Sequence, residues 1–325
     1  MIPSSPTAPL GTVRGAFEAT GSPSWIMRSV LRHGLDARHG FALALDLGGD
    51  GMRQSRQATA ALLAEGAADV ADTDFLSIAR LRREGVPVAA VFPYGRIMGG
   101  VVVPAASGVR DLAGLRGRTV GVVHALDKNW LLVRAACLRR HGFDPAREAR
   151  VVEAGSKTLL LDWLERGAVD VAVLYWHLVP RLVTRRRFRE ICDVLDLVAE
   201  VSGASPPTTF FVFREDFVAA RREAVRAFVA AYRGAVALLR ASRALWAEAV
   251  AAPDGLDAAP AKALRASWSR RVCTAWHPGD VLALSRLLDT LRDIAGEDAV
   301  GGIPALPAEM FHLGFAREGG TPWSL

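Results

Sequence analysis

Short apolar runs alternate with amphipathic segments from residue 12 to about residue 213. The runs have the length of strands buried on both faces of a sheet, and the segments between them repeat with the 3.6-residue period of a helix. Glycines follow several of these segments directly, where a helix C-cap needs a left-handed residue. The alternation predicts α/β sheets covered by helices on both faces. The expected strands are 12–17, 41–47, 68–71, 86–92, 99–103, 119–123, 150–153, 169–174, 197–201 and 209–213.

The chain after residue 213 shows only helical periodicity, so this tail must pack as a helical layer on one of two earlier sheets. Two extended apolar segments flanked by Gly or Pro, 99–104 and 208–213, are suited to cross between the sheets as hinge strands. The expected helices are 24–33, 53–65, 75–83, 128–141, 157–166 and 177–184, followed in the tail by 216–239, 243–250, 260–269 and 278–295.

The composition is that of a globular protein, with 51% hydrophobic and 23% charged residues in 325. No stretch approaches the roughly 20 apolar residues needed to cross a bilayer. Residues 1–14 lack a basic n-region and an apolar core, so they are not predicted to be a secretory signal, which leaves a cytoplasmic location open.

The positive charge, 40 Lys and Arg against 34 Asp and Glu, is spread along the chain. The one dense run is 181–189, whose arginines we expect on a solvated helix face. No nucleic-acid partner is therefore predicted. The cysteines Cys137, Cys192 and Cys273 lack the spacing of a disulfide framework or a zinc site, so no metal is expected.

The glycine-rich segment 48–54 fails the dinucleotide fingerprint because Gln54 stands at the third glycine position. Phosphate-loop, zinc-protease and nucleophile-elbow motifs are also absent from the sequence. No cofactor and no catalytic residue are predicted.

Polar residues gather instead at strand-to-helix junctions, where open α/β sheets bind ligands through backbone N–H groups and helix N-termini. Lys128 and Lys157 fall in the first turns of helices, where the helix dipole disfavours a cation unless an anion compensates it. They are either ligand contacts or ordinary exposed lysines. The candidate ligand-binding residues are Thr20, Ser22, Ser24, Trp25, Asp74, Arg96, His124, Lys128, Asn129, Trp130, Ser156, Lys157, Tyr175, Trp176 and His177.

Each group of candidates has a structural alternative. Asp74 suits a helix N-cap, residues 175–177 suit packing between domains, and Arg96 suits a salt bridge at the hinge. As ligand contacts, the hydroxyls at 20–24 would fix one end of the ligand. The lysines would hold its negative charge, and Trp25, Trp130 and residues 175–176 would cover its apolar face.

Several motifs occur in the order seen in one family. Residues 112–122 (LAGLRGRTVGV) resemble its "DL-x-G-K-x-V-G-V" segment, and 64–71 (AEGAADVA) and 164–172 (LERGAVDVA) resemble its "L-x-x-G-x-x-D-x-A" stretches. Residues 134–145 are similar to its "L-x-x-x-G-x-d-p" helix end. The chain thus resembles type II periplasmic solute-binding proteins, namely the nitrate, sulfonate and taurine binding components of ABC importers and the related thiamine pyrimidine-precursor group.

The resemblance implies an α/β fold of two lobes joined by two hinge strands, with lobe one formed by 12–98 and 208–325 and lobe two by 99–207. The all-helical tail is then expected on lobe one. The implied function is that of a periplasmic substrate-binding component, a monomer partnered by a transporter permease. Its lobes would close on a small anionic organic ligand such as a sulfonate, nitrate, or an aromatic or heterocyclic acid.

An enzyme on the same fold is the alternative. The pyrimidine synthase branch carries a cysteine-rich iron motif, which this sequence lacks. A decarboxylase acting on aromatic acids would need a positioned acid or base, for which His124, Lys128 and His177 are the candidates. A binding protein without catalytic residues is the favoured interpretation.

Overall fold

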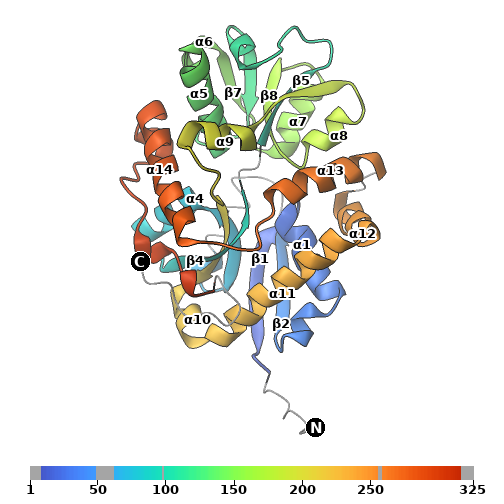
Figure 1. The fold of residues 1–325 in the computed structure, drawn as a ribbon, viewed down its shortest axis with the longest axis vertical. Coiled ribbons are helices and arrows are strands. Elements are labelled where there is room, and N and C mark those ends of the chain that lie inside the picture. Colours follow the sequence, from blue (N-terminus) through green and yellow to red (C-terminus); the bar gives the residue numbers. More distant parts are fainter. Residues whose placement is uncertain (1–8, 49–61, 97–98, 255–257, 316–325) are drawn as a thin grey trace.

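The computed structural model describes residues 9–48, 62–96, 99–254 and 258–315. It contains two five-stranded sheets, one above the other in Figure 1. The first has the order β2-β1-β3-β10-β4 and the second the order β7-β6-β8-β5-β9. The strands of the first sheet are β1 Thr12–Glu18, β2 Ala42–Gly48, β3 Val70–Asp74, β4 Val88–Gly95 and β10 Thr209–Arg214. Those of the second are β5 Gly99–Pro104, β6 Thr119–Val122, β7 Arg150–Glu153, β8 Val171–Tyr175 and β9 Phe188–Asp193.

Each sheet combines parallel strands with an antiparallel one that follows a crossing of the chain. Strand β1 pairs in parallel with β2 and β3, and β6 pairs in parallel with β7 and β8. The chain enters the second sheet through β5, antiparallel to β8 and β9, and returns to the first through β10, antiparallel to β3 and β4. The predicted α/β class, with crossing segments at 99–104 and 208–213, is confirmed.

Helices cover both sheets (Figure 1). In the α/β part they are α1 Ser22–Arg32, α2 Leu35–Arg38, α4 Phe75–Arg83, α5 Lys128–His141, α6 Pro145–Glu148, α7 Lys157–Glu165, α8 Val179–Val183 and α9 Val194–Ser202. In the tail they are α10 Glu215–Ala220, α11 Arg222–Ala241, α12 Arg243–Asp254, α13 Ala258–Arg271 and α14 Pro278–Ala295. None of the described helices combines the length and the apolar character needed to span a membrane. Of the predicted helix 53–65, residues 53–61 lie outside the described part, as do residues 49–54 of the glycine-rich segment.

Two expectations in the second sheet are wrong. The segment 197–201 is not a strand but the end of α9, whose apolar residues recur at helical spacing and whose start is capped by Asp193. The arginine run does not form a helix face: Arg185, Arg186 and Arg187 are exposed in a turn, and Arg189 lies in β9. Five residues are too few to distinguish the helical period of α9 from a strand. The charged residues of the arginine run gave no apolar pattern that would have indicated β9 after it.

The C-terminal tail is helical, as predicted, and it reaches both sheets. Helix α11 packs against α1 and α2 beside the first sheet, whereas α13 contacts α8 and α14 contacts α5 and α9 beside the second. The predicted helix 216–239 is divided at Arg221, which ends α10 and precedes α11. The tail therefore joins the two halves of the molecule in addition to covering one of them.

Candidate ligand-binding site

A cavity of about 40 Å³ lies where the two sheets face each other. It is bounded by the carboxyl ends of β1, β3 and β8, by the end of β4 and the start of the crossing strand β10, and by the first turns of α1, α5 and α7. A volume of this size holds about one water molecule, so the two halves of the site are close together. The lining residues are Glu18, Thr20, Gly21, Ser22, Pro23, Asp72, Thr73, Tyr94, Lys128, Lys157, Tyr175, Trp176, His177 and Thr209.

Both candidate lysines are buried at this cavity, with Lys128 4% and Lys157 2% exposed. The alternative that they are ordinary exposed lysines is therefore wrong. The Nζ atom of Lys157 forms an ion pair with Glu18 and lies 4.6 Å from the centroid of the Tyr175 ring. The Nζ atom of Lys128 lies 3.4 Å from Oδ2 of Asp74. The anions that compensate these first-turn lysines are thus carboxylates of the opposite sheet.

The carboxylate of Asp72 completes the charged groups of the cavity. It accepts hydrogen bonds from the Glu18 backbone N–H and from the Tyr94 hydroxyl, both at 3.2 Å. Among the described residues it has no ion pair, whereas Glu18 and Asp74 each face a lysine. Burial, and then the nearby charge of Glu18, raises the pKa of Asp72 to about 7.

The N-terminus of α1 opens onto the cavity without a side-chain cap from the described residues. Gly21 is its N-cap and has φ 93°, a left-handed region that a residue with a Cβ rarely adopts. The Thr20 hydroxyl beside it is buried and has no hydrogen-bond partner in the described part of the chain. By contrast, α5 and α7 begin with the side-chain caps Asp127 and Ser156. Free backbone N–H groups at a helix start favour an anion there.

Aromatic residues after β8 form one wall of the cavity. The Tyr175 hydroxyl donates to Oδ2 of Asp127 at 2.6 Å, which fixes the ring at the start of α5. Trp176 packs edge to face against Trp25, with ring centroids 5.8 Å apart. Burial, and then the charge of Lys157, lowers the pKa of His177 to about 3. His177 is therefore a neutral wall residue at pH 7.

Other predicted site residues lie behind this wall or away from the cavity. Trp25 is buried between Trp176 and Trp246, and Trp130 is buried in the hydrophobic core. Ser24 is buried within α1 and accepts a hydrogen bond from Nε of Arg28 at 3.2 Å. The two indoles therefore support the site from behind instead of lining it.

The remaining candidates have structural partners outside the cavity. Asp74 caps α4 by accepting from the backbone N–H of Ser77, and it also faces Lys128. Ser156 caps α7, and Asn129 donates its backbone N–H to Asp127. The capping that the sequence offered as an alternative for Asp74 is thus present.

Arg96 and His124 also lie off the cavity wall. The Arg96 guanidinium donates to the Ser205 carbonyl at 3.2 Å. Arg96 thus bonds to backbone, and no salt bridge of this residue is found in the described part of the chain. His124 is a half-exposed side chain 3.6 Å from Glu153. It therefore contributes no acid or base to this cavity.

Sequence reasoning did not select Glu18, Asp72, Thr73, Tyr94 or Thr209, although all of them line the cavity. Glu18 is the last residue of β1, and Asp72 lies within β3, two residues before its end. Their signal in the sequence was a carboxylate close to a strand-to-helix junction, in a chain that also places lysines at helix starts. Tyr94 lies in β4 and Thr209 in the crossing strand β10, and neither belongs to a chemical motif in the sequence.

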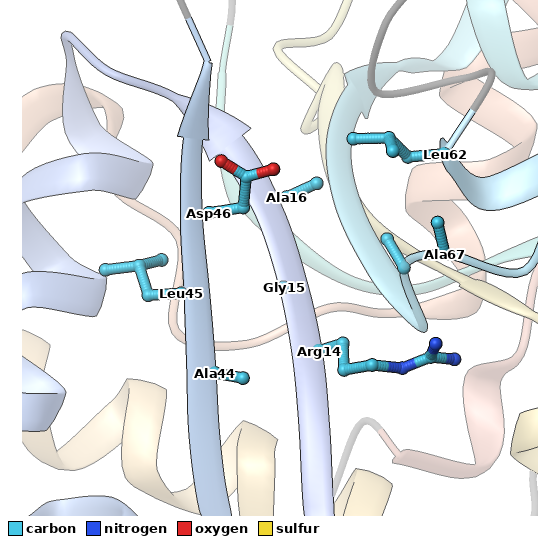
Figure 2. Close-up of a pocket in the computed structure, with 9 residues that line it drawn as sticks. Arg14, Gly15, Ala16, Ala44, Leu45, Asp46, Leu62 and Ala67 are labelled. Atoms are coloured by element: carbon cyan, nitrogen blue, oxygen red, sulfur yellow. The ribbon is translucent and has the colours of Figure 1, made fainter.

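A second cavity, of about 250 Å³, lies against β1 and β2 (Figure 2). Its wall is mostly small or apolar, with Arg14 and Asp46 as charged members, and Arg14 is already paired with Asp69. None of the candidate ligand-binding residues lines it. Within the described ranges, no three His, Cys, Asp or Glu side chains gather as a group that could hold a metal ion.

A comparison with protein families matches residues 52–256, more than half of the chain, to the family described as "ABC transporter, phosphonate, periplasmic substrate-binding protein". The chain belongs to this family. It is a substrate-binding component of an ABC importer, the family is periplasmic, and ABC substrate-binding proteins are not enzymes. The resemblance inferred from the motifs is confirmed. A search of curated proteins found no significant match.

Several solved structures share the fold of this chain. The alkanesulfonate-binding protein SsuA from Xanthomonas axonopodis pv. citri, bound to MOPS, superposes with a TM-score of 0.72 at 16% identity, covering 94% of this chain and 99% of that one. A protein from Bordetella bronchiseptica RB50 gives 0.72 at 20% identity, covering 94% and 95%. The periplasmic aliphatic sulphonate binding protein SsuA from Escherichia coli gives 0.69 at 16% identity, covering 91% and 94%. At these identities the likeness shows the two-lobed periplasmic-binding-protein fold.

Proposed function

We propose that this substrate-binding protein holds a small organic anion between its two sheets, at the cavity of about 40 Å³ described above, which widens to admit the ligand when the lobes part. The lobes would be 12–98 with 208–325 and 99–207, closing on the ligand about the crossing strands. A phosphonate is named in the family description, and sulfonates are named for the SsuA proteins of the same fold. Both are oxyanions, and we place the ligand of this chain in the same class.

The observation that carries the proposal is the open start of α1. Gly21 and Ser22 line the cavity at a helix start that has no side-chain cap from the described residues, and the buried Thr20 hydroxyl beside them lacks a partner among these residues. A buried polar group without a hydrogen bond costs about 1–3 kcal/mol. An oxyanion would satisfy these donors together, and the dipole of α1 would favour its charge.

The lysines can add to this subsite because an ammonium group has three N–H donors. Among the described residues, the one contact found for the Lys128 ammonium is the long 3.4 Å contact to Asp74, which leaves donors for a ligand. Both lysines come from helices beside the second sheet, α5 and α7, and their carboxylate partners come from strands of the first. Closure of the lobes therefore assembles the charged groups, and the ligand would add its charge to them.

Asp72 sets a condition on the ligand. Glu18 and Asp72 line the cavity and Asp74 lies against Lys128, so three carboxylates stand near two lysines. A bound oxyanion would increase this negative excess unless Asp72 is protonated or the ligand presents a hydrogen-bond donor to it. We therefore propose that the ligand combines an oxyanion with a donor group, or binds best below neutral pH.

The family also suggests where the protein acts and with which partner. We propose that it acts as a monomer in the periplasm and delivers its ligand to a transporter permease. The three acid or base candidates for the enzyme alternative do not favour it, and one of them, Lys128, faces the carboxylate of Asp74. His124 lies away from the cavity, and the lowered pKa of His177 makes it a poor base at neutral pH.

The test is isothermal titration of the purified protein with ethanesulfonate, ethylphosphonate, taurine and nitrate at pH 6.5. We expect saturable one-to-one binding of at least one of these anions. A variant with Lys128→Gln and Asp74→Asn, which removes the cation and keeps the pair neutral, should lose at least tenfold in affinity. Lys262→Gln is the matched control, because Lys262 is exposed on α13. A folded protein that binds none of the anions, or equal affinity in the double variant, would overturn the proposal.

A further inference from the structure

The end of α13 brings a buried guanidinium to the junction of the two sheets. Arg271 is 1% exposed, although it is the last residue of a helix in the C-terminal tail. Figure 1 shows α13 running beside α8 on the one side and joined to α12 on the other. A buried arginine needs several partners to offset its desolvation, so its contacts indicate what it does.

The backbone of Arg271 is fixed to the first sheet. Its carbonyl accepts from the backbone N–H of Arg96 at 2.9 Å, and Cys273 donates its backbone N–H to the carbonyl of Tyr94 at 3.1 Å. Val272 and Gly95 form an isolated antiparallel bridge between these contacts. The end of the tail helix is thus anchored beside the last residues of β4, next to the crossing into β5.

The side chain of Arg271 is fixed to the second sheet. Its Nη2 forms an ion pair with Asp193, the last residue of β9 and the N-cap of α9. Its Nη1 donates to the Ser267 hydroxyl at 2.7 Å and to the Ser267 carbonyl at 3.1 Å, which holds the guanidinium plane in one orientation. One residue therefore bridges the two halves of the fold.

The same guanidinium touches the wall of the ligand cavity. Its Cζ lies 5.6 Å from the centroid of the Trp176 ring, within cation–π range, and Trp176 lines the cavity. Arg270 offers a natural comparison, because it also pairs with Asp193 and with Asp196 but is half-exposed. No contact of Arg270 with Trp176 is found among the described residues.

We infer that Arg271 is a positioning residue that couples the ligand cavity to lobe closure, by holding Trp176 against the ligand while tying β9 to the first sheet. This inference rests on the proposed binding of an anion in that cavity. Opening the lobes would require the Asp193 pair and the Trp176 contact to separate together. Arg271 therefore sets how long a bound ligand stays rather than how fast it arrives.

The test compares Arg271→Lys with Arg270→Gln. Lysine keeps the charge. It lacks the planar guanidinium that lets one side chain pair with Asp193, donate to Ser267 and stack on the Trp176 ring at the same time. We expect Arg271→Lys to release the ligand at least tenfold faster in stopped-flow displacement, with an association rate within threefold of the wild type. Arg270→Gln should change both rates by less than threefold. In a Trp176→Phe background, the effect of Arg271→Lys on release should shrink to less than threefold.

Unchanged release in Arg271→Lys, or an equal acceleration in Arg270→Gln, would overturn the inference. So would a fall in melting temperature with unchanged release, because that is the result of a merely structural role. Ser267→Ala, which removes one anchor of the guanidinium, serves as a milder variant if Arg271→Lys does not fold, and it should also accelerate release.

The radius of gyration of the ligand-free protein separates this inference from the functional proposal. If the wild type binds no anion, the proposed function fails by itself. The coupling is then tested by scattering, where Arg271→Lys should be more expanded than Arg270→Gln. Equal radii would overturn the coupling as well.

Discussion

The charged side chains at the cavity are largely buried away from water, so replacing any one of them should change stability or ligand affinity by a measurable amount. Lys128 and Asp74 are both nearly fully buried and face each other across the two sheets. Breaking such a pair costs far more than replacing both members, because the remaining charge stays buried. The sequence identified the lysines correctly as unusual, but it could not show that their compensating charges lie 54 and 139 residues away.

Replacing Lys128 with Gln should lower the free energy of unfolding by about 3 kcal/mol, because its buried ion pair with Asp74 is broken. The double variant with Asp74→Asn should recover most of this loss, since Asn is also a good N-cap for α4. Urea unfolding of the single and double variants measures both values. If the single and the double variant were destabilised equally, the charge of Asp74 left without Lys128 would have no measurable free-energy cost.

The raised pKa of Asp72 predicts pH-dependent binding. The carboxyl holds its proton below pH of about 7 and becomes a buried anion above it. Affinity for ethanesulfonate, which stays ionised throughout, should therefore fall as the pH rises from 6 to 8. Asp72→Asn should flatten the profile, while Tyr94→Phe, which keeps the carboxylate, should retain a slope. Titration calorimetry across this range is the measurement, and a flat wild-type profile would contradict the assignment.

At the scale of elements, helix starts decide where an anion can be held. Helices α4, α5 and α7 begin with capping side chains, whereas α1 begins at Gly21 without one from the described residues. The sequence predicted that the first helix starts at residue 24, which is two residues late. The left-handed Gly21 lets the helix start at Ser22, so its uncapped first residues line the cavity.

Thr20→Val tests this element. The change keeps the shape of the side chain and removes the unpartnered hydroxyl, so stability should stay within about 1 kcal/mol of the wild type or rise. Anion affinity should fall about tenfold if the hydroxyl donates to the ligand, equivalent to about 1.4 kcal/mol. Thermal unfolding and calorimetric titration give the two values. If Thr20→Val lowers the stability but leaves the anion affinity unchanged, the Thr20 hydroxyl does not contact the ligand.

The whole molecule works as two halves held together at several places: the crossing strands, the ion pairs at the cavity and the C-terminal tail. Ligand binding adds a further link, so saturation with a bound anion should shift the population toward the closed form and reduce the radius of gyration. Small-angle scattering with and without ligand checks this. A radius that does not change on binding would mean that the free protein is already closed, and would leave the lobes without a hinge motion.

The sequence by itself determined the α/β class, the helical tail, the crossing segments and the family, because these depend on local periodicity and on short motifs read in order. It also located the junctions that carry the cavity. Only the tertiary structure decided which junction residues meet. It paired Lys157 with Glu18, turned Trp25 and Trp130 into the core, and brought Arg271 from the tail to Trp176. Such contacts depend on how two separately built sheets face each other, and no local pattern encodes that orientation.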